Sequence, residues 1–111
     1  MKKTNRANSL YAKEAMKLLA ARIKTVRIEQ KIKTTELAER AGISRDLLRR
    51  IEKGDPGCSI GTVFEVAALL GIRLFNSDID NLRLHNMFFQ DKLALLPDRV
   101  WAEKHELDDD F

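Results

Sequence analysis

Apolar residues recur along most of this chain at spacings of three and four, the period of an α-helix with one buried face. From Ser9 to Gln30 the sequence contains no Gly or Pro, and Leu19, Ile23 and Val26 repeat at this interval among Lys and Arg residues. The pattern predicts a long amphipathic first helix, capped by Asn8 or Ser9.

Three shorter helices are expected next, because each candidate has a recognisable start and stop. Residues 34–41 read as one helix, and Gly42 follows where a left-handed residue is needed. Ser44 is a natural N-cap for a helix that runs through Lys53, and Gly54 closes it. Ser59 caps a helix that runs to about Leu70, with Gly71 after it.

Beyond Gly71 the pattern changes. The run from Ile72 to Phe75 alternates in character and favours a brief strand. A fifth helix is then predicted up to Pro97, because a run of apolar residues with one Asn follows a 3,4,3,4,3 spacing. This first seam consists of Ile79, Leu82, Asn86, Phe89, Leu93 and Leu96. It spans under three heptads, so packing on the domain's own core and pairing with a second chain both remain open.

These elements define an all-α fold with five helices and one compact domain. The predicted organisation is a disordered N-terminus at 1–8, the domain at 9–75, a C-terminal helix at 76–96 and a flexible acidic tail at 97–111. A tail with so few apolar residues is not expected to fold alone.

Charge is divided unevenly along the chain. Residues 1–54 carry fifteen Lys and Arg against six Asp and Glu, a balance of +9, whereas residues 55–111 carry five against eleven, a balance of −6. A basic half suits a polyanionic partner, because neutralising phosphates releases counterions.

Several classes of protein are not expected. The single Cys58 forms no intramolecular disulfide, and His85 and His105 lie too far from it for zinc-ligand spacing, so we expect no metal. There is no Gly-rich phosphate loop and no nucleophile motif, so we expect no enzyme, no cofactor and no small-molecule substrate. Without a signal peptide or a long apolar run, a soluble cytoplasmic protein with no membrane contact is expected.

The most informative stretch runs from Thr34 to Gly54. Small Ala38 permits close helix packing, Gly42 makes a sharp turn, and Leu48 and Ile51 point to the core. Together with the closing Ile51-Glu52-Lys53-Gly54 and the helix after it, this stretch resembles the helix-turn-helix of the Cro/C1-type (XRE) family. The resemblance covers about residues 18–71 and implies a five-helix DNA-binding domain.

Periodicity leaves four charged side chains on the outward side of the third helix. Arginine is suited to bidentate contact with guanine, and aspartate accepts from cytosine. The family resemblance makes Arg45, Asp46 and Arg50 the base-reading residues, and Arg49 a contact to base, phosphate or solvent. Phosphate contacts are expected near helix N-termini and at flanking basic or hydroxyl groups, namely Thr34, Ser44, Lys53, Ser59 and Thr62.

Two positions depart from the family pattern. The family commonly has Gln where Thr34 stands, and a capping Thr or Ser where Lys33 stands. One phosphate contact is therefore in doubt, and the missing cap should cost the second helix up to ~1 kcal/mol unless Thr34 or Thr35 takes that role.

Arg27 and Glu52 match family positions that pair an arginine of the first helix with a glutamate closing the third. If the pair is buried, removing one partner should cost ~3–5 kcal/mol, whereas a surface pair is worth under ~1 kcal/mol. Both alternatives remain open.

The C-terminal residues resemble the tails of antitoxins encoded with HipA-type kinases, through Leu96-Pro97-Asp98-Arg99-Val100 and the final Asp109-Asp110-Phe111. The resemblance implies a HipB-like antitoxin, a homodimer that represses its own operon at an inverted repeat and binds the kinase. It also implies dimer pairing by the strand at 72–75. We expect an interface made by Ile72, Leu74, Phe75, Ile79 and Leu82.

Large apolar groups in the tail, Val100, Trp101 and Phe111, are candidate contacts for the partner. Trp101 folding back onto the fifth helix is the alternative. For the whole chain, the alternatives are a stand-alone XRE-type repressor without a toxin partner, and an interaction module that no longer binds DNA.

Overall fold

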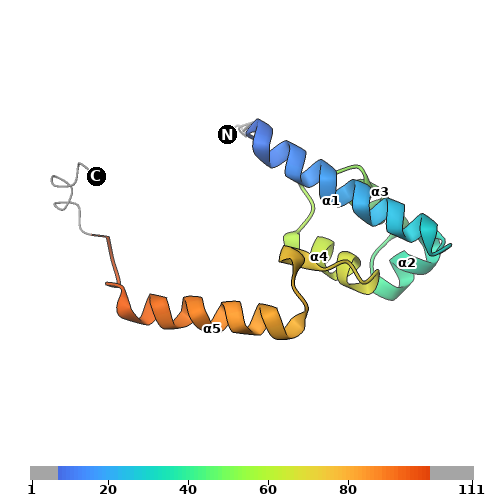
Figure 1. Cartoon of the computed structure of the whole chain (residues 1–111). Coiled ribbons are helices and arrows are strands. Elements are labelled where there is room, and N and C mark those ends of the chain that lie inside the picture. The colour runs from blue at the N-terminus through green and yellow to red at the C-terminus, as the bar shows by residue number, and fades with distance from the viewer. Residues whose placement is uncertain (1–7, 101–111) are drawn as a thin grey trace. The chain divides into compact units, whose positions relative to one another are not determined.

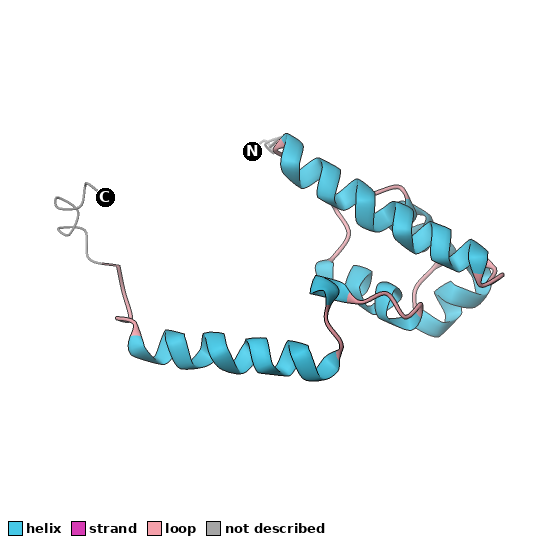
Figure 2. Cartoon of the chain, in the orientation of Figure 1, coloured by secondary structure: helices cyan, strands magenta, loops and turns pink. Residues whose placement is uncertain are grey.

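The computed structural model of the chain describes residues 8–100. Within them the chain forms five α-helices, with a 3-10 turn before the last and no strand (Figure 1, Figure 2). The helices are α1 (Leu10–Glu29), α2 (Thr34–Ala41), α3 (Arg45–Glu52), α4 (Ile60–Leu69) and α5 (Ile79–Leu95), and the turn is η1 (Leu74–Asn76). The predicted five-helix, all-α fold is confirmed. The chain divides into two compact units, residues 1–76 and residues 77–111.

Local side-chain caps start most of the helices. Ser9 accepts a hydrogen bond from the Ala12 amide, and Ser44 and Ser59 do the same for amides three residues further on, at 3.0–3.2 Å. Each cap satisfies an N–H group that has no partner inside the helix. Gly42 ends α2 with a φ of 70°, in the left-handed region that glycine enters without penalty.

The core of the first unit lies where α1 to α4 meet. Ile23 of α1, Leu37 of α2, Leu48 of α3 and Val66 of α4 are all fully buried. Ala38 is buried at the α2 contact with α3, as its small size predicted. Leu19 and Val26 are half-buried and pack against this cluster.

Gly54 lies beside α1 at the end of α3. It has a φ of 77°, and a Cβ atom built on it would stand 3.6 Å from the Lys17 Cα and 3.7 Å from the Met16 carbonyl oxygen. A side chain there would be strained by its backbone and would fill the remaining space against α1. The positive φ, and not a lack of space, is therefore the reason for a glycine at this position.

The segment after α4 corrects the prediction of a strand at 72–75. The Ile72 amide bonds to the Ala67 carbonyl at 3.0 Å, and Ile72 is buried in the core. Phe75 and Asn76 both have a positive φ, of 55° and 54°, which turns the chain instead of extending it. These residues finish α4 and form η1.

In the second unit, Asp78 caps α5 by accepting from the Asn81 amide at 2.9 Å. The helix has no buried residue, and Ile79, Phe89 and Leu93 of the first seam are each more than half exposed. None of the helices within residues 8–100 combines the length and apolar character that crossing a membrane requires.

Candidate nucleic-acid interface

The outward side of α3 carries the four charged residues that periodicity selected. Leu48 and Ile51 are buried in the core, so the side chains on the other side of this short helix face solvent. Arg45, Asp46, Arg49 and Arg50 are all exposed. The fold thus presents three guanidinium groups and a carboxylate along about two turns of one helix, dimensions that fit a DNA major groove.

The four residues differ in how they are held. Arg45 forms no ion pair within residues 8–100, and its guanidinium is free to donate to a base. Arg49 lies 3.5 Å from the Asp46 carboxylate, so these two partly neutralise each other. Of the predicted base readers, Arg45 has the most freedom to reach a guanine edge.

Arg50 is fixed by a contact that the sequence did not reveal. Its Nε donates to Asp55 Oδ2 at 2.7 Å, and the Gly57 amide donates to the other oxygen, Oδ1, at 2.8 Å. The hydrogen bond from Arg50, with that from Gly57, lowers the pKa of Asp55, and the same hydrogen bond raises the pKa of Arg50. The turn after α3 therefore orients Arg50, one of the predicted base readers, through its Nε atom.

Asp55 is thus a functional candidate that pattern reasoning treated only as part of an Asp-Pro-Gly turn. The available signal was a carboxylate five residues beyond Arg50, across the Gly54 turn that brings the chain back. Such a pair orients an arginine side chain.

The candidate phosphate contacts lie at helix ends. Lys33 is the N-cap of α2 and makes no side-chain cap bond, and neither Thr34 nor Thr35 has moved into the cap position. The first amides of α2 are left without that cap, a feature that suits an anion. Ser59 Oγ accepts from the Thr62 amide and donates to Thr62 Oγ1 at 3.0 Å, so both hydroxyls sit at the start of α4. Lys53 is exposed at the end of α3.

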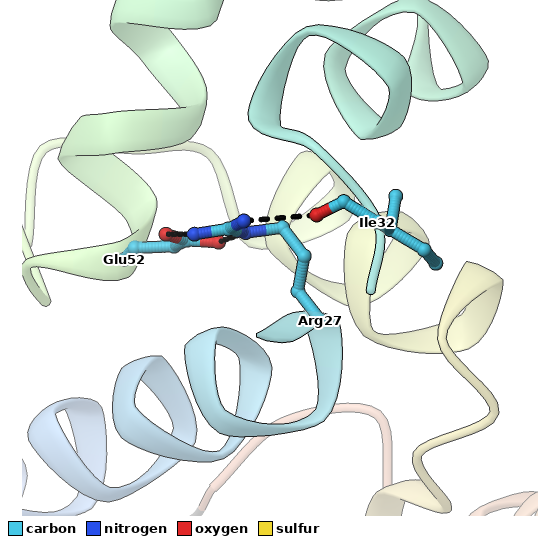
Figure 3. Close-up of polar contacts among 3 residues, drawn as sticks. All are labelled: Arg27, Ile32 and Glu52. Atoms are coloured by element: carbon cyan, nitrogen blue, oxygen red, sulfur yellow. Dashed lines mark hydrogen bonds and ion pairs between the residues drawn. The ribbon is translucent and has the colours of Figure 1, made fainter. Parts of the chain in front are cut away.

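The structure brings Arg27 and Glu52 together in a buried ion pair (Figure 3). Arg27 Nε and Nη2 donate to the two carboxylate oxygens at 2.7 and 3.1 Å, and Nη1 donates to the Ile32 carbonyl at 2.9 Å. The side chains are only 11% and 6% exposed. The guanidinium thus joins the end of α1, the α1–α2 connection and the last residue of α3 in one rigid contact.

The residues expected at the dimer interface and in the tail differ in how exposed they are. Of the residues expected at the dimer interface, Ile72 is buried and Leu74 is half-buried against the core. Phe75 and Ile79 are exposed, and Leu82 is half-exposed. In the tail, Val100 is exposed, whereas Trp101 and Phe111 lie outside the described residues, as do residues 1–7 of the predicted disordered start at 1–8.

Cys58 is a free, half-buried thiol. Within residues 8–100 no group of three His, Cys, Asp or Glu side chains is placed to hold a metal ion.

Comparison with known proteins agrees with this geometry. Residues 23–75, which contain α2 to α4 and the second part of α1, match the family described as helix-turn-helix. No curated protein matched the chain. The matched family is one of DNA-binding regulator domains and not of enzymes. Residues 23–75 of this chain are therefore similar to a DNA-binding helix-turn-helix domain, and the charged outward side of α3 lies within the matched segment.

Proposed function

We propose that this chain is an antitoxin that represses its own operon as a homodimer and binds a HipA-type kinase. The observation that carries the regulatory part is the exposed α3 surface with Arg45, Asp46, Arg49 and Arg50, inside a segment that matches a DNA-binding family. The antitoxin part is supported by the resemblance of residues 96–111 to the tails of HipB-like proteins.

Direct readout by α3 is tested by comparing operator with random DNA. Arg45→Ala should lose about 1–3 kcal/mol of operator affinity, because a bidentate arginine–guanine contact is absent, while weak non-specific binding remains. The matched control is Arg83→Ala, which removes the same charge from an exposed position on α5. An equal loss on both DNAs would place Arg45 on a phosphate. Failure of the wild-type chain to bind its own promoter region would refute repression.

Binding as a homodimer is supported by the exposed first seam of α5 and by the reach of one recognition helix, which reads only a few base pairs. Two-fold pairing along the seam would give an inverted-repeat operator with half-sites about 10 base pairs apart or a multiple. Phe89→Asp should shift sedimentation toward the monomer, whereas Gln90→Asp, with the same charge change one residue away, should not. A wild-type monomer at micromolar concentration that still binds the operator would contradict pairing.

Kinase binding is assigned to residues 97–111. The chain has a single Trp, Trp101, so the tryptophan emission of this chain comes from the tail alone and is read after subtraction of the kinase's own emission. Adding the kinase should shift its emission to shorter wavelength. Trp101→Ala should weaken the complex by about 2 kcal/mol or more if this side chain is a hot spot, with Lys104→Ala as the control.

Deleting residues 97–111 separates the two roles. Kinase binding should fall and operator binding by the dimer should be unchanged. Unchanged kinase affinity, or lost operator binding, would show that the roles are assigned wrongly. Co-purification from the native operon without any kinase would favour the stand-alone repressor.

A further inference from the structure

Helix α5 has a second apolar stripe that the proposed homodimer does not use. Leu84, Phe88, Asp91 and Leu95 follow a 4,3,4 spacing, which places them along one line of the helix, roughly opposite the first seam. Leu84 and Phe88 are about 60% exposed, and Leu95 is 87% exposed. A helix that is apolar on two sides needs two partners. We name these four residues the second seam.

Asp91 gives the second seam a specific requirement. This carboxylate forms no ion pair within residues 8–100. If the seam is covered by a partner, the charge leaves water and must meet a cation, because a buried charge without a partner is strongly unfavourable. The surface that covers the second seam is therefore apolar with a basic group near its middle.

The first unit carries such a surface. A groove of about 400 Å³ lies between α1 and η1, with Ala15, Leu18 and Leu19 on one side and Leu74 and Phe75 on the other. Leu18 is 63% exposed and Phe75 is 77% exposed. Arg22 and Arg73 also line this groove, both exposed and neither in an ion pair within residues 8–100.

We propose that the second seam of α5 docks in the α1–η1 groove of a second copy of this chain, with Asp91 between Arg22 and Arg73. The apolar side chains of the seam match the apolar lining of the groove. The single carboxylate matches two guanidinium groups that form no ion pair with any described residue, a complementarity that also fixes the register of the helix.

We assign the α1–η1 groove to a second copy of this chain because a stable dimer needs more contact surface than the first seam provides. Stable interfaces involve about 20–30 residues from each chain. The first seam supplies six residues, whereas the first seam, the second seam and the groove together supply eighteen, close to the lower end of that range. A two-fold dimer forms the seam–groove contact twice, so the assembly is closed. The inference rests on the homodimer proposed above.

The docking has a consequence for DNA binding. The groove is lined by α1, and α1 is joined to α3 by the buried Arg27–Glu52 pair. A helix that docks on the partner's α1 therefore fixes the distance between the two α3 helices, and with it the spacing of the half-sites that the dimer reads.

Cysteine cross-linking between differently tagged chains tests the placement, in a Cys58→Ser background that removes the natural thiol. One chain carries Leu18→Cys in the groove and the other carries Phe88→Cys in the second seam. Oxidation should join the two tags, because a disulfide requires Cβ atoms within about 4.5 Å. Ala94→Cys, on a side of α5 between the two seams, is the control and should not cross-link. Failure of the Phe88 pair to exceed this control would overturn the docking.

Charge reversal tests the partner of Asp91. Asp91→Arg should weaken the dimer by at least about tenfold, because it sets three like charges together. Mixing this variant with a chain that carries Arg22→Glu and Arg73→Glu should restore a heterodimer, since each α5 then meets a groove of opposite charge in its partner. If the dimer is restored only when Asp91→Arg, Arg22→Glu and Arg73→Glu are combined in one chain, and not by mixing the two variants, α5 docks on its own chain. That result would overturn the proposal.

The outcomes also separate this inference from the proposed homodimer. If Phe89→Asp dissociates the dimer while Asp91→Arg leaves its mass unchanged, pairing along the first seam stands and the groove assignment fails. If the wild-type chain sediments as a monomer, both fail. Circular dichroism should be unchanged for Asp91→Arg, because Asp91 is an exposed helix residue.

Discussion

Breaking the buried Arg27–Glu52 pair should be among the most damaging single changes in this domain. Glu52→Gln keeps the shape of the side chain but leaves the Arg27 guanidinium, which is 11% exposed, without its counter-charge. Removing one member of a buried ion pair costs about 3–5 kcal/mol. A domain of this size is stable by only about 5–15 kcal/mol, so the variant should be marginally folded.

The surface pair Arg40–Glu36 provides a matched control. It has the same chemistry, an N–O distance of 2.8 Å and an i,i+4 position on α2, but its side chains are 48% and 49% exposed. Glu36→Gln should therefore cost no more than about 0.5 kcal/mol. The contrast between the two Glu→Gln variants isolates burial as the cause.

Urea and thermal unfolding followed by circular dichroism measure the difference. Protein concentration must be held fixed, because association of the folded chain raises its apparent stability. At about 4–8 °C for each kcal/mol, Glu52→Gln should lower Tm by about 12 °C or more, and Glu36→Gln by about 4 °C or less. Equal losses in the two variants would refute the conclusion that the buried pair locks α1 to α3.

Replacing both partners gives a second test. Arg27→Met with Glu52→Leu removes both charges and leaves only the Ile32 carbonyl without its donor, at a cost of about 1–3 kcal/mol. The double variant should therefore be more stable than Glu52→Gln, and a cost equal to the sum of the two single changes would contradict strong coupling.

Further predictions follow from local geometry and are checked by the same unfolding measurements. Ser44→Ala should cost about 0.5–2 kcal/mol, because it removes the cap of α3. Both Gly42→Ala and Gly54→Ala place a side chain at positive φ, so both should destabilise the fold, and neither added Cβ atom meets a steric clash that would raise this cost. Since Arg50 lowers the pKa of Asp55, this contact stabilises the fold above the unfolded pKa of about 3.9 and is lost as pH falls through the lower folded value. The stability gap between wild type and Asp55→Asn should thus close in acid below about pH 4, and a gap independent of pH would contradict the contact.

The sequence alone determined the helices and the outward side of α3. Helix starts and stops depend on contacts between residues three or four apart, such as the Ser44 hydroxyl with the Leu47 amide, so they are visible in local order. The positions of Arg45 and Arg49 follow from the period of the helix once Leu48 and Ile51 are taken as core. The exposed charged side of α3 was therefore predictable without knowing how the helices pack.

Tertiary structure decided what depends on distant segments meeting. Arg27 and Glu52 are 25 residues apart, and only the packing of α1 against α3 removes both from water and makes their pair strong. Ile72 to Phe75 has the composition of a strand, but burial of Ile72 and the left-handed turn at Phe75 commit this segment to closing α4. The α1–η1 groove joins residues more than fifty positions apart, and no pattern of period two or 3.6 records such a meeting, because periodicity describes one element and packing relates several.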